Sequence, residues 1–124
     1  AGLSTAKARC FIALAEWQAC GRLDLAGLAA ADDESAHRAL LKLPGVGPWT
    51  AEIYLLTALG RADVFPAGDR ALQLSAQDLF GLAEPPAATE LARLAASWSP
   101  WRAVAARLLW SHYRGLRNMP QAVD

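Results

Sequence analysis

A glycine-rich segment and an acidic residue beyond it are the parts of this chain best suited to chemistry. The segment reads Leu-Pro-Gly-Val-Gly-Pro-Trp-Thr at residues 43–50, and Asp69 follows its last residue by 19 positions. Two glycines two residues apart allow a tight turn and a close approach of the backbone to a ligand. Amides at the start of a following helix would point outwards, where they can bind a phosphate group. A fixed carboxylate can stabilise developing positive charge or orient an attacking water.

Helices are expected on both sides of the glycine segment. Upstream, apolar residues recur at helical spacing at Ala36, Ala39, Leu40 and Leu43. Downstream, Pro48 has the φ angle suited to the first position of a helix, and an apolar pattern continues to Leu59 before Gly60. Residues 35–60 therefore read as a helix, a glycine hairpin and a second helix.

The rest of the chain also predicts helices, so we expect an all-α domain of about six helices spanning residues 1–124. The further helices are expected over residues 4–20, 69–80, 87–98 and 99–113. Gly21, Gly81 and Gly115 would stop three of them, and Ser99-Pro100 would cap and open the last. Asp32 or Asp33 would cap the helix before the hairpin. The candidate core of the first helix is Phe11, Ile12, Leu14 and Ala15.

Composition and charge narrow the class of protein. Net charge is zero, which argues weakly against binding nucleic acid by bulk charge alone. Ten of the 12 cationic residues are arginines, however, and residues 91–117 carry five arginines and no acidic residue. Arginine suits bidentate phosphate contacts, although a solvated helical surface explains each one equally well. No run approaches the roughly 20 apolar residues of a membrane span, and no export signal is visible, so we expect a cytoplasmic protein.

Together, the motifs resemble the helix-hairpin-helix motif of base-excision DNA glycosylases. That family's signature is Leu-Pro-Gly-Val-Gly, two variable residues, Thr-Ala, a loop containing Gly and Pro, and an Asp. Here its parts are residues 43–47, Thr50 and Ala51, the loop at residues 64–68, and Asp69. A Gly-Val-Gly sequence alone would be weak evidence, because short glycine pairs occur in many turns. The combination of parts and their spacing is specific.

The resemblance is to the bacterial inducible 3-methyladenine DNA glycosylases and runs over most of the chain. It includes the opening residues 2–8 and the tryptophan-rich residues 98–110. It implies that residues 1–124 are the C-terminal portion of a glycosylase domain, because the chain opens where these enzymes are already well inside it.

The resemblance implies that Asp69 is the catalytic residue, whose carboxylate promotes cleavage of the bond between base and sugar. An Asp at this position is also a preferred helix N-cap, and the two roles are compatible. Trp49 stands where bifunctional relatives have the Lys that forms a Schiff base. The chain therefore resembles the monofunctional branch, which uses water as the nucleophile. Its two cysteines exclude the four-cysteine iron–sulfur cluster of the bifunctional branch.

A pocket for the extruded base is also implied. Trp110 aligns with an aromatic residue that stacks on the base, and Trp49 and Ile53 would line the same pocket. An electron-rich indole face attracts electron-poor alkylated purines more than normal bases. Ile53 and Ser111 stand where the 3-methyladenine DNA glycosylase that the chain resembles has tyrosines. The pocket implied here is therefore less aromatic than the pocket of that enzyme. For each Trp in a helix, packing in the core is the alternative.

The hairpin is implied to hold one DNA strand through its backbone. The residues that would contact the phosphates are Gly45, Val46, Gly47, Trp49, Thr50 and, through its side chain, Lys42. The carbonyl oxygens of Leu41, Leu43 and Gly45 would bind a monovalent cation, Na⁺ or K⁺, that bridges to a phosphate. No other cofactor is expected.

The function implied is that of a monofunctional DNA glycosylase, which hydrolyses the N-glycosidic bond of damaged, alkylated purines in base-excision repair. Its partner would be double-stranded DNA containing damaged bases. We expect a monomer in the bacterial cytoplasm, associated with the nucleoid. The alternative is a non-catalytic helix-hairpin-helix DNA-binding module, or an inactive fragment of such a glycosylase. A helical protein-interaction domain, in which the hairpin is a plain turn, is a third reading.

Overall fold

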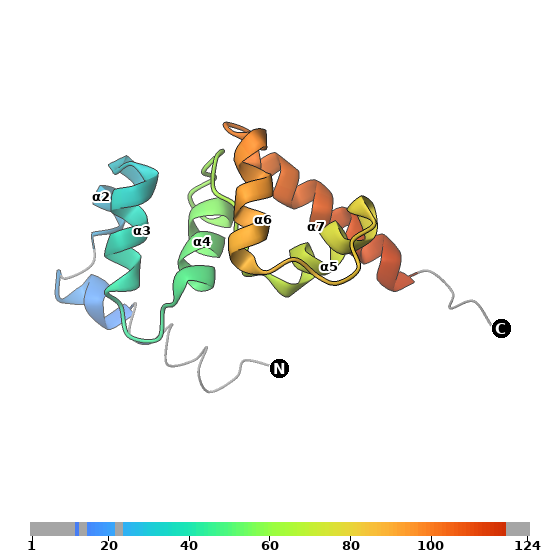
Figure 1. Cartoon of the computed structure of the whole chain (residues 1–124). Helices are drawn as coiled ribbons and strands as arrows, with labels where there is room; N and C mark the ends of the chain where they lie inside the picture. Colours follow the sequence, from blue (N-terminus) through green and yellow to red (C-terminus); the bar gives the residue numbers. More distant parts are fainter. Residues whose placement is uncertain (1–11, 13–14, 22–23, 119–124) are drawn as a thin grey trace. The chain divides into compact units, whose positions relative to one another are not determined.

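A computed structural model describes residues 12, 15–21 and 24–118 of the chain (Figure 1). All regular elements within these residues are helices, which confirms the expected all-α class. The chain divides into two compact units, Ala1–Gly60 and Arg61–Asp124, and each is described by itself. A single domain over the whole chain stays a prediction.

The first unit contains the hairpin and the helices around it. Residues 15–19 are helical, and a turn at residues 20 and 21 follows them. Gly21 has a left-handed φ of 80°, as expected for the residue that stops a helix. Three helices follow, namely α2 (Leu25–Ala30), α3 (Asp33–Leu41) and α4 (Pro48–Thr57). The short α2 was not expected, because six residues give too little periodicity to recognise. Asp32 rather than Asp33 caps α3, since its side chain accepts a 2.7 Å hydrogen bond from the amide of Ser35.

Apolar side chains on α2, α3, the hairpin and α4 are buried in this unit. They are Leu28, Ala36, Leu40, Leu43, Ala51, Leu55 and Leu56. The expected core of the first helix is wrong where it can be compared, because Ile12 is 58% exposed and Ala15 is also exposed. A short apolar cluster does not guarantee burial, since much of any folded surface is apolar. Ser4, Phe11 and Leu14 lie outside the described residues.

The second unit consists of α5 (Arg70–Phe80), α6 (Ala88–Ala95), the 3₁₀ helix η1 (Ala96–Trp98) and α7 (Arg102–Asn118). Helix α5 ends as expected at Gly81, which has a left-handed φ of 62°. Helices α5 and α7 pack side by side, and α6 also packs on α5 (Figure 1). The buried apolar side chains that these helices contribute are small or aliphatic: Leu72, Ala76, Leu91, Ala95, Ala103, Ala106 and Leu109.

Both expected ends of the last helix are wrong. Helix α7 begins at Arg102, two residues after Pro100, and it continues through Gly115 to Asn118. Ser99 does not cap it locally, because its hydroxyl donates a 2.6 Å hydrogen bond to Oδ2 of Asp63. Gly115 does not have the positive φ of a helix stop, and an added Cβ there would meet no atom within 4 Å.

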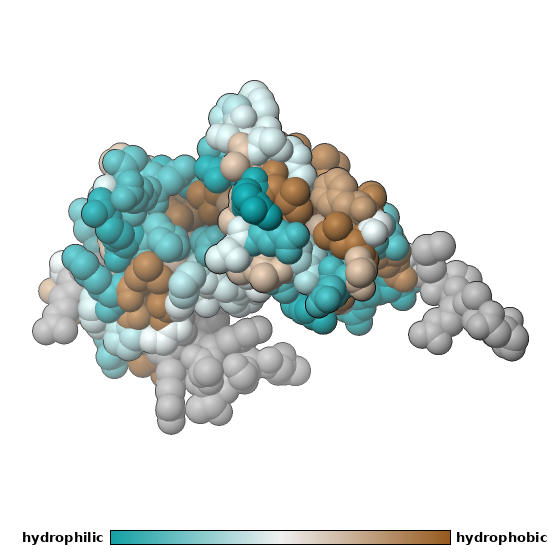
Figure 2. Space-filling view, viewed as in Figure 1, coloured by the Kyte–Doolittle hydropathy of each residue, from teal (hydrophilic) through white to brown (hydrophobic). Residues whose placement is uncertain are grey.

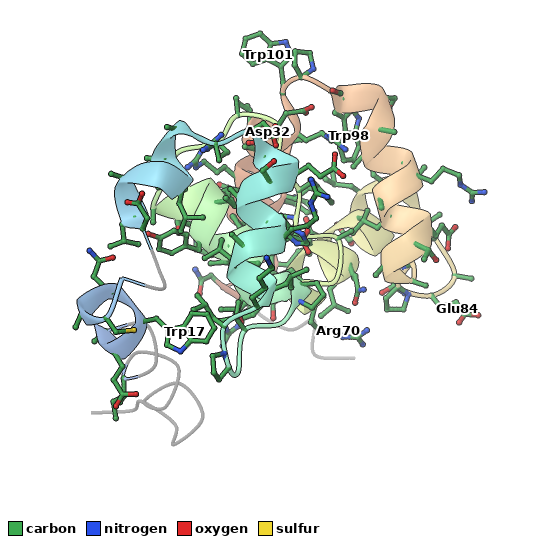
Figure 3. The ribbon with its side chains drawn as sticks, turned by 90° about the vertical axis from the view of Figure 1, so that its left-hand side faces the viewer. Trp17, Asp32, Arg70, Glu84, Trp98 and Trp101 are labelled. Carbon is green, nitrogen blue, oxygen red and sulfur yellow. The ribbon has the colours of Figure 1, made fainter. Side chains whose placement is uncertain are left out.

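Several large apolar side chains of the second unit lie at the surface. Leu79 and Phe80, at the end of α5, are 51% and 49% exposed. Val104 and Leu108 on one side of α7 are 48% and 66% exposed, and Trp101 projects from the start of that helix (Figure 3). Figure 2 shows brown apolar surface over this part of the molecule. None of the described helices is long and apolar enough to cross a membrane.

The carboxylate of Asp63 joins the loop before α5 to the start of α7. It accepts hydrogen bonds from Nε and Nη2 of Arg102 at 2.8 and 3.0 Å, and from the Arg102 amide at 3.4 Å. The amide of Ala103 adds a 3.0 Å bond to the carbonyl of Ala62. The hydrogen bonds from Arg102, followed by the one from Ser99, lower the pKa of Asp63 from 3.8 to about 2.

Replacing Asp63 by Asn should remove the charge while keeping the shape. We expect the free energy of unfolding at pH 7 to fall by about 1 kcal/mol, since the pair is partly exposed. The pKa of Asp63 is lowered on folding, so its contribution is present above pH 3.8 and is lost as the pH falls through about 2. The acid-induced loss of stability in this window should therefore be smaller in the variant. Urea unfolding at several pH values, followed by circular dichroism, measures both effects.

The control for this prediction is Glu84→Gln, which neutralises an exposed carboxylate between α5 and α6. If Asp63→Asn unfolds like this control at every pH, the Asp63 carboxylate does not hold α7.

Candidate functional site

The hairpin between α3 and α4 is a tight turn closed by backbone hydrogen bonds. The amide of Leu43 donates to the carbonyl of Leu40 at 3.1 Å, and the amide of Val46 donates to the carbonyl of Leu43 at 3.2 Å. Leu43 and Val46 are both buried, which fixes the turn on its own unit. Gly45 has a left-handed φ of 77°, so this position favours glycine for conformational reasons.

Gly47 is different, because nothing in the described part of the chain requires a glycine there. It is the N-cap of α4 with a φ of −95°, and an added Cβ would meet none of the described atoms within 4 Å. As a glycine it offers no side chain to cap the amides of the first turn, which include those of Trp49 and Thr50. Asp32 and Asp69 do cap α3 and α5 in this way. The start of α4 therefore has no side-chain cap, unlike the starts of α3 and α5.

Two of the three expected pocket residues share a face of α4. Trp49 is 44% exposed, and Ile53 lies four residues further on, half-buried. Glu52 lies beside Ile53, and burial raises the pKa of its carboxyl group to about 7. Sequence reasoning missed Glu52, because nothing in the sequence indicates that this acidic side chain is half-buried.

The three carbonyls expected to hold a cation belong to the hairpin. Leu41 is the last residue of α3, and a carbonyl at a helix end lacks a helical partner. Within the described residues, a backbone hydrogen bond reaches the carbonyl of Leu43 but neither of the other two, Leu41 and Gly45. A carbonyl oxygen has two lone pairs, so the bond from Val46 leaves Leu43 able to accept again. Each of the three oxygens therefore keeps a lone pair that can accept, whereas the Val46 amide already donates inside the turn.

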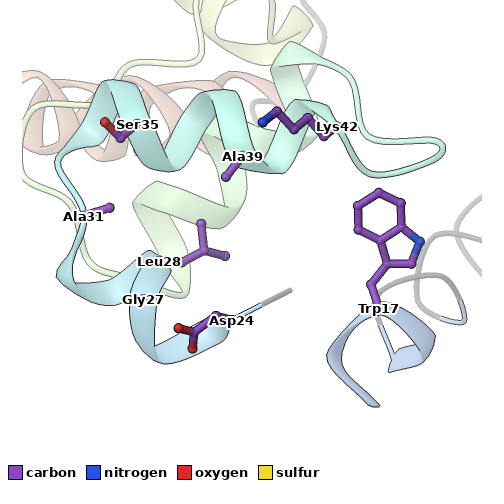
Figure 4. Close-up of a pocket in the computed structure, with 8 residues that line it drawn as sticks. All are labelled: Trp17, Asp24, Gly27, Leu28, Ala31, Ser35, Ala39 and Lys42. Atoms are coloured by element: carbon purple, nitrogen blue, oxygen red, sulfur yellow. The ribbon is translucent and has the colours of Figure 1, made fainter. Parts of the chain in front are cut away.

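A pocket of about 300 Å³ lies in the first unit (Figure 4). Its lining comes from α2, α3 and their flanks: Trp17, Asp24, Gly27, Leu28, Ala31, Ser35, Ala39 and Lys42. Lys42, exposed at the end of α3, is the expected phosphate contact that also lines this pocket. The lining includes neither Asp69 nor Trp110.

Asp69 lies in the second unit, where it is the N-cap of α5. Its Oδ1 accepts a 3.2 Å hydrogen bond from the amide of Leu72, and its side chain is largely covered, since the residue is 9% exposed. Its own amide donates to the carbonyl of Pro66 at 2.9 Å. Gln73, one turn into α5, donates from Nε2 to the carbonyl of Ala67 at 3.3 Å. The loop before α5 and the first turn of the helix thus fix the position of this carboxylate.

Trp110 reaches the same carboxylate from α7. Its indole nitrogen, Nε1, donates to Oδ1 of Asp69 at 3.4 Å, although the two residues are 41 positions apart in sequence. The side chain is half-buried, and the adjacent Ser111 is exposed. The second unit therefore brings together the expected catalytic residue and one expected pocket residue.

The residues that support this pair were not singled out by the sequence. Asp63 and Arg102 link the loop that leads to Asp69 with the helix that carries Trp110. An Asp and an Arg far apart in one sequence give no sign that they meet. His112 contacts Asp78 at 2.8 Å between α7 and α5. The described residues contain no cluster of three or more His, Cys, Asp or Glu side chains that could hold a metal ion.

Comparison with known proteins supports the resemblance to DNA glycosylases that the sequence motifs indicated. No family model matches the chain. It is 46% identical over 83 residues to the Mycobacterium tuberculosis protein described as a probable bifunctional transcriptional activator/DNA repair enzyme AlkA, covering 67% of this chain and 16% of that protein. The crystal structure of the Bacillus halodurans DNA-3-methyladenine glycosidase matches with a TM-score of 0.78 and 32% identity, covering 94% of this chain and 54% of that one.

A third match is the Schizosaccharomyces pombe 3-methyladenine DNA glycosylase Mag1 in complex with abasic DNA. Its TM-score is 0.74 at 26% identity, and the alignment covers 89% of this chain and 54% of that one. The chain thus spans little more than half the length of these relatives, and far less of the mycobacterial protein. By sequence and by fold, the chain belongs to the helix-hairpin-helix DNA glycosylase superfamily, and it is similar to a part of the 3-methyladenine DNA glycosylases.

Proposed function

We propose that this chain is part of a monofunctional DNA glycosylase that removes alkylated purines from double-stranded DNA. The observation that carries the proposal is the largely buried carboxylate of Asp69, which follows the hairpin at the family's spacing and contacts the indole of Trp110. The relatives' names and the complex of Mag1 with abasic DNA support it. We further propose that the protein acts as a monomer in the bacterial cytoplasm, at the nucleoid.

The proposed reaction is hydrolysis of the bond between the base and C1′ of the sugar. As this bond breaks, its electron pair leaves with the base, and positive charge develops on the sugar. The carboxylate of Asp69 stabilises that charge and orients a water that attacks C1′. The attacking water loses a proton, which goes to solvent when the purine was cationic and is matched by protonation of the base when it was neutral, and an abasic site remains. Trp49 has no amine, so no Schiff base with the sugar forms at this position.

Recognition of the base would rest on aromatic side chains. Alkylated purines are electron-poor, and indole faces attract them more strongly than normal bases. We propose that Trp110 and Trp49 contribute such surfaces, and that Ile53 adds an apolar wall. The backbone amides of Gly45, Gly47, Trp49 and Thr50, with Lys42, would contact phosphates, and the carbonyls of Leu41, Leu43 and Gly45 would hold Na⁺ or K⁺. Such binding is independent of base sequence and is weakened by salt.

A non-catalytic DNA-binding module is the second candidate. The observation that favours it is that the hairpin and the start of α4 lie wholly within the first unit, whereas Asp69 belongs to the second. A hairpin unit can hold DNA without any catalytic residue. The two candidates predict the same DNA binding and differ in base release.

Replacing Asp69 by Asn separates these candidates. Asn is nearly isosteric, caps helices about as well, and keeps an oxygen for the bonds from Leu72 and Trp110, so folding should be preserved. We expect base release from alkylated duplex DNA to slow by about 10²–10³, because the charge that faces the cationic transition state is lost. The rate is measured by strand cleavage at abasic sites in alkali. Asp32→Asn is the matched control, since it makes the same change at the cap of α3.

Base release by Asp69→Asn at the parental rate would leave Asp69 as a helix cap only and would favour the module. The non-catalytic module would also be favoured if the parental chain bound DNA but released no base.

The substitution Gly47→Ala tests whether the hairpin binds a DNA phosphate. Because the added Cβ meets no atom of the residues that the structure describes, folding should change little, while a bound phosphate would be pushed away. We expect affinity for an abasic-site duplex to fall about tenfold, the cost of one charge-assisted hydrogen bond. Fluorescence anisotropy measures it, with Gly115→Ala in α7 as the control. Parental affinity in Gly47→Ala would exclude the start of α4 as the phosphate contact.

The monofunctional assignment is tested by trapping with borohydride. Without an amine at position 49, no covalent complex with lesion-containing DNA should form above background. Denaturing gels detect such a complex. A trapped adduct would overturn the assignment and direct attention to Lys42 or a terminal amine.

A further inference from the structure

Two hydrogen-bond donors from different helices meet on one oxygen of Asp69. The amide of Leu72, in the first turn of α5, lies 3.2 Å from Oδ1, and Nε1 of Trp110, on α7, lies 3.4 Å from the same oxygen. The first bond is the ordinary contact of a helix N-cap. The second is not needed for capping, and it comes from a residue 41 positions away.

We propose that Trp110 is a positioning residue, whose indole N–H fixes the orientation of the Asp69 carboxylate. This inference rests on the proposed function of Asp69 and gives Trp110 a role beyond stacking on the base. The bond from Leu72 ties the carboxylate to the start of its own helix. A second donor from another helix further restricts its orientation, which is how catalytic groups are held in a productive geometry.

The surroundings make Trp110 a rigid donor. Its neighbour Leu109 is 5% exposed, and Ala106, one turn earlier on α7, is fully buried. The start of the same helix is held by Arg102 on Asp63. Trp110 itself is half-buried, so packing restricts its side chain while one part stays accessible.

The chemistry of indole suits this role better than that of a cationic donor. An Arg or Lys in this place would donate equally well but would neutralise the charge of the carboxylate. The indole N–H is a neutral donor with no acceptor capacity. It therefore leaves the negative charge of Asp69 available for a cationic transition state. The donating edge and the stacking face are different parts of the ring, so the two roles can be tested separately.

Trp110→Phe is the separating variant, because it keeps an aromatic face and removes the N–H. If Trp110 acts through Asp69, kcat for base release should fall about tenfold, the cost of one hydrogen bond to a charged group, with KM little changed. In the Asp69→Asn background, the same substitution should have a much smaller effect. Trp101→Phe is the matched control, since it makes the same change at an indole that is 64% exposed.

The hydrogen bond itself can be observed without any activity. In ¹⁵N-labelled protein, the five tryptophans give five indole N–H signals, and the one missing in Trp110→Phe belongs to Trp110. We expect this signal to move in Asp69→Asn, because that substitution changes the acceptor of the hydrogen bond, while the other four indole signals stay in place. If Trp110→Phe does not fold, Asp69→Asn alone suffices, because the one indole signal that moves identifies the indole that contacts Asp69.

The outcomes separate the two proposals. A Trp110→Phe variant with raised KM and unchanged kcat, or an indole signal indifferent to Asp69, overturns the positioning role and leaves a stacking residue. If Asp69→Asn releases base at the parental rate, the proposed function fails, and the indole signal still decides whether the contact exists. A reduced kcat together with a coupled indole signal supports the inference.

Discussion

In the second unit, the loop that carries Asp69 and the helix that carries Trp110 have to be held against each other, and the carboxylate of Asp63 does this. The forked guanidinium of Arg102 binds both of its oxygens, and Ser99 binds one as well. The carboxylate also lies at the start of α7, where the amide of Arg102 and the helix dipole favour negative charge. A distant residue therefore supplies the cap that the local sequence does not.

Fixing the start of α7 also fixes which of its residues face the core. Ala103, Ala106 and Leu109 follow at helical spacing and are buried. Because two of these three side chains are methyl groups, α5 and α7 can approach closely. Trp110 then lies at the margin of this packed face, half-buried, where its indole nitrogen reaches Asp69, the N-cap of α5.

Features that depend on neighbouring residues could be predicted from the sequence. Asp69 before α5, Gly81 after it and the glycine hairpin before α4 are where local capping and turn rules put them. The start of α7 could not be predicted, because it depends on Asp63, which is remote in sequence. Local rules predicted a cap at Ser99-Pro100, but the hydroxyl of Ser99 binds Asp63 instead. Nor could the exposure of Leu79 and Phe80 be predicted, since periodicity identifies apolar residues without saying which ones are covered. The contact between Trp110 and Asp69 likewise required the packing of two helices.

The two roles of Asp69 have an evolutionary consequence. The same side chain caps α5 and, in the proposed function, supplies the catalytic charge, so selection for a folded protein and for an active enzyme acts on one position. Asp and Asn are separated by a single nucleotide change, and both cap helices. A lineage released from selection for catalysis could therefore lose base excision in one step and keep a folded protein with its hairpin intact. In such families, the identity of this one side chain would distinguish descendants that still repair DNA from those that only bind it.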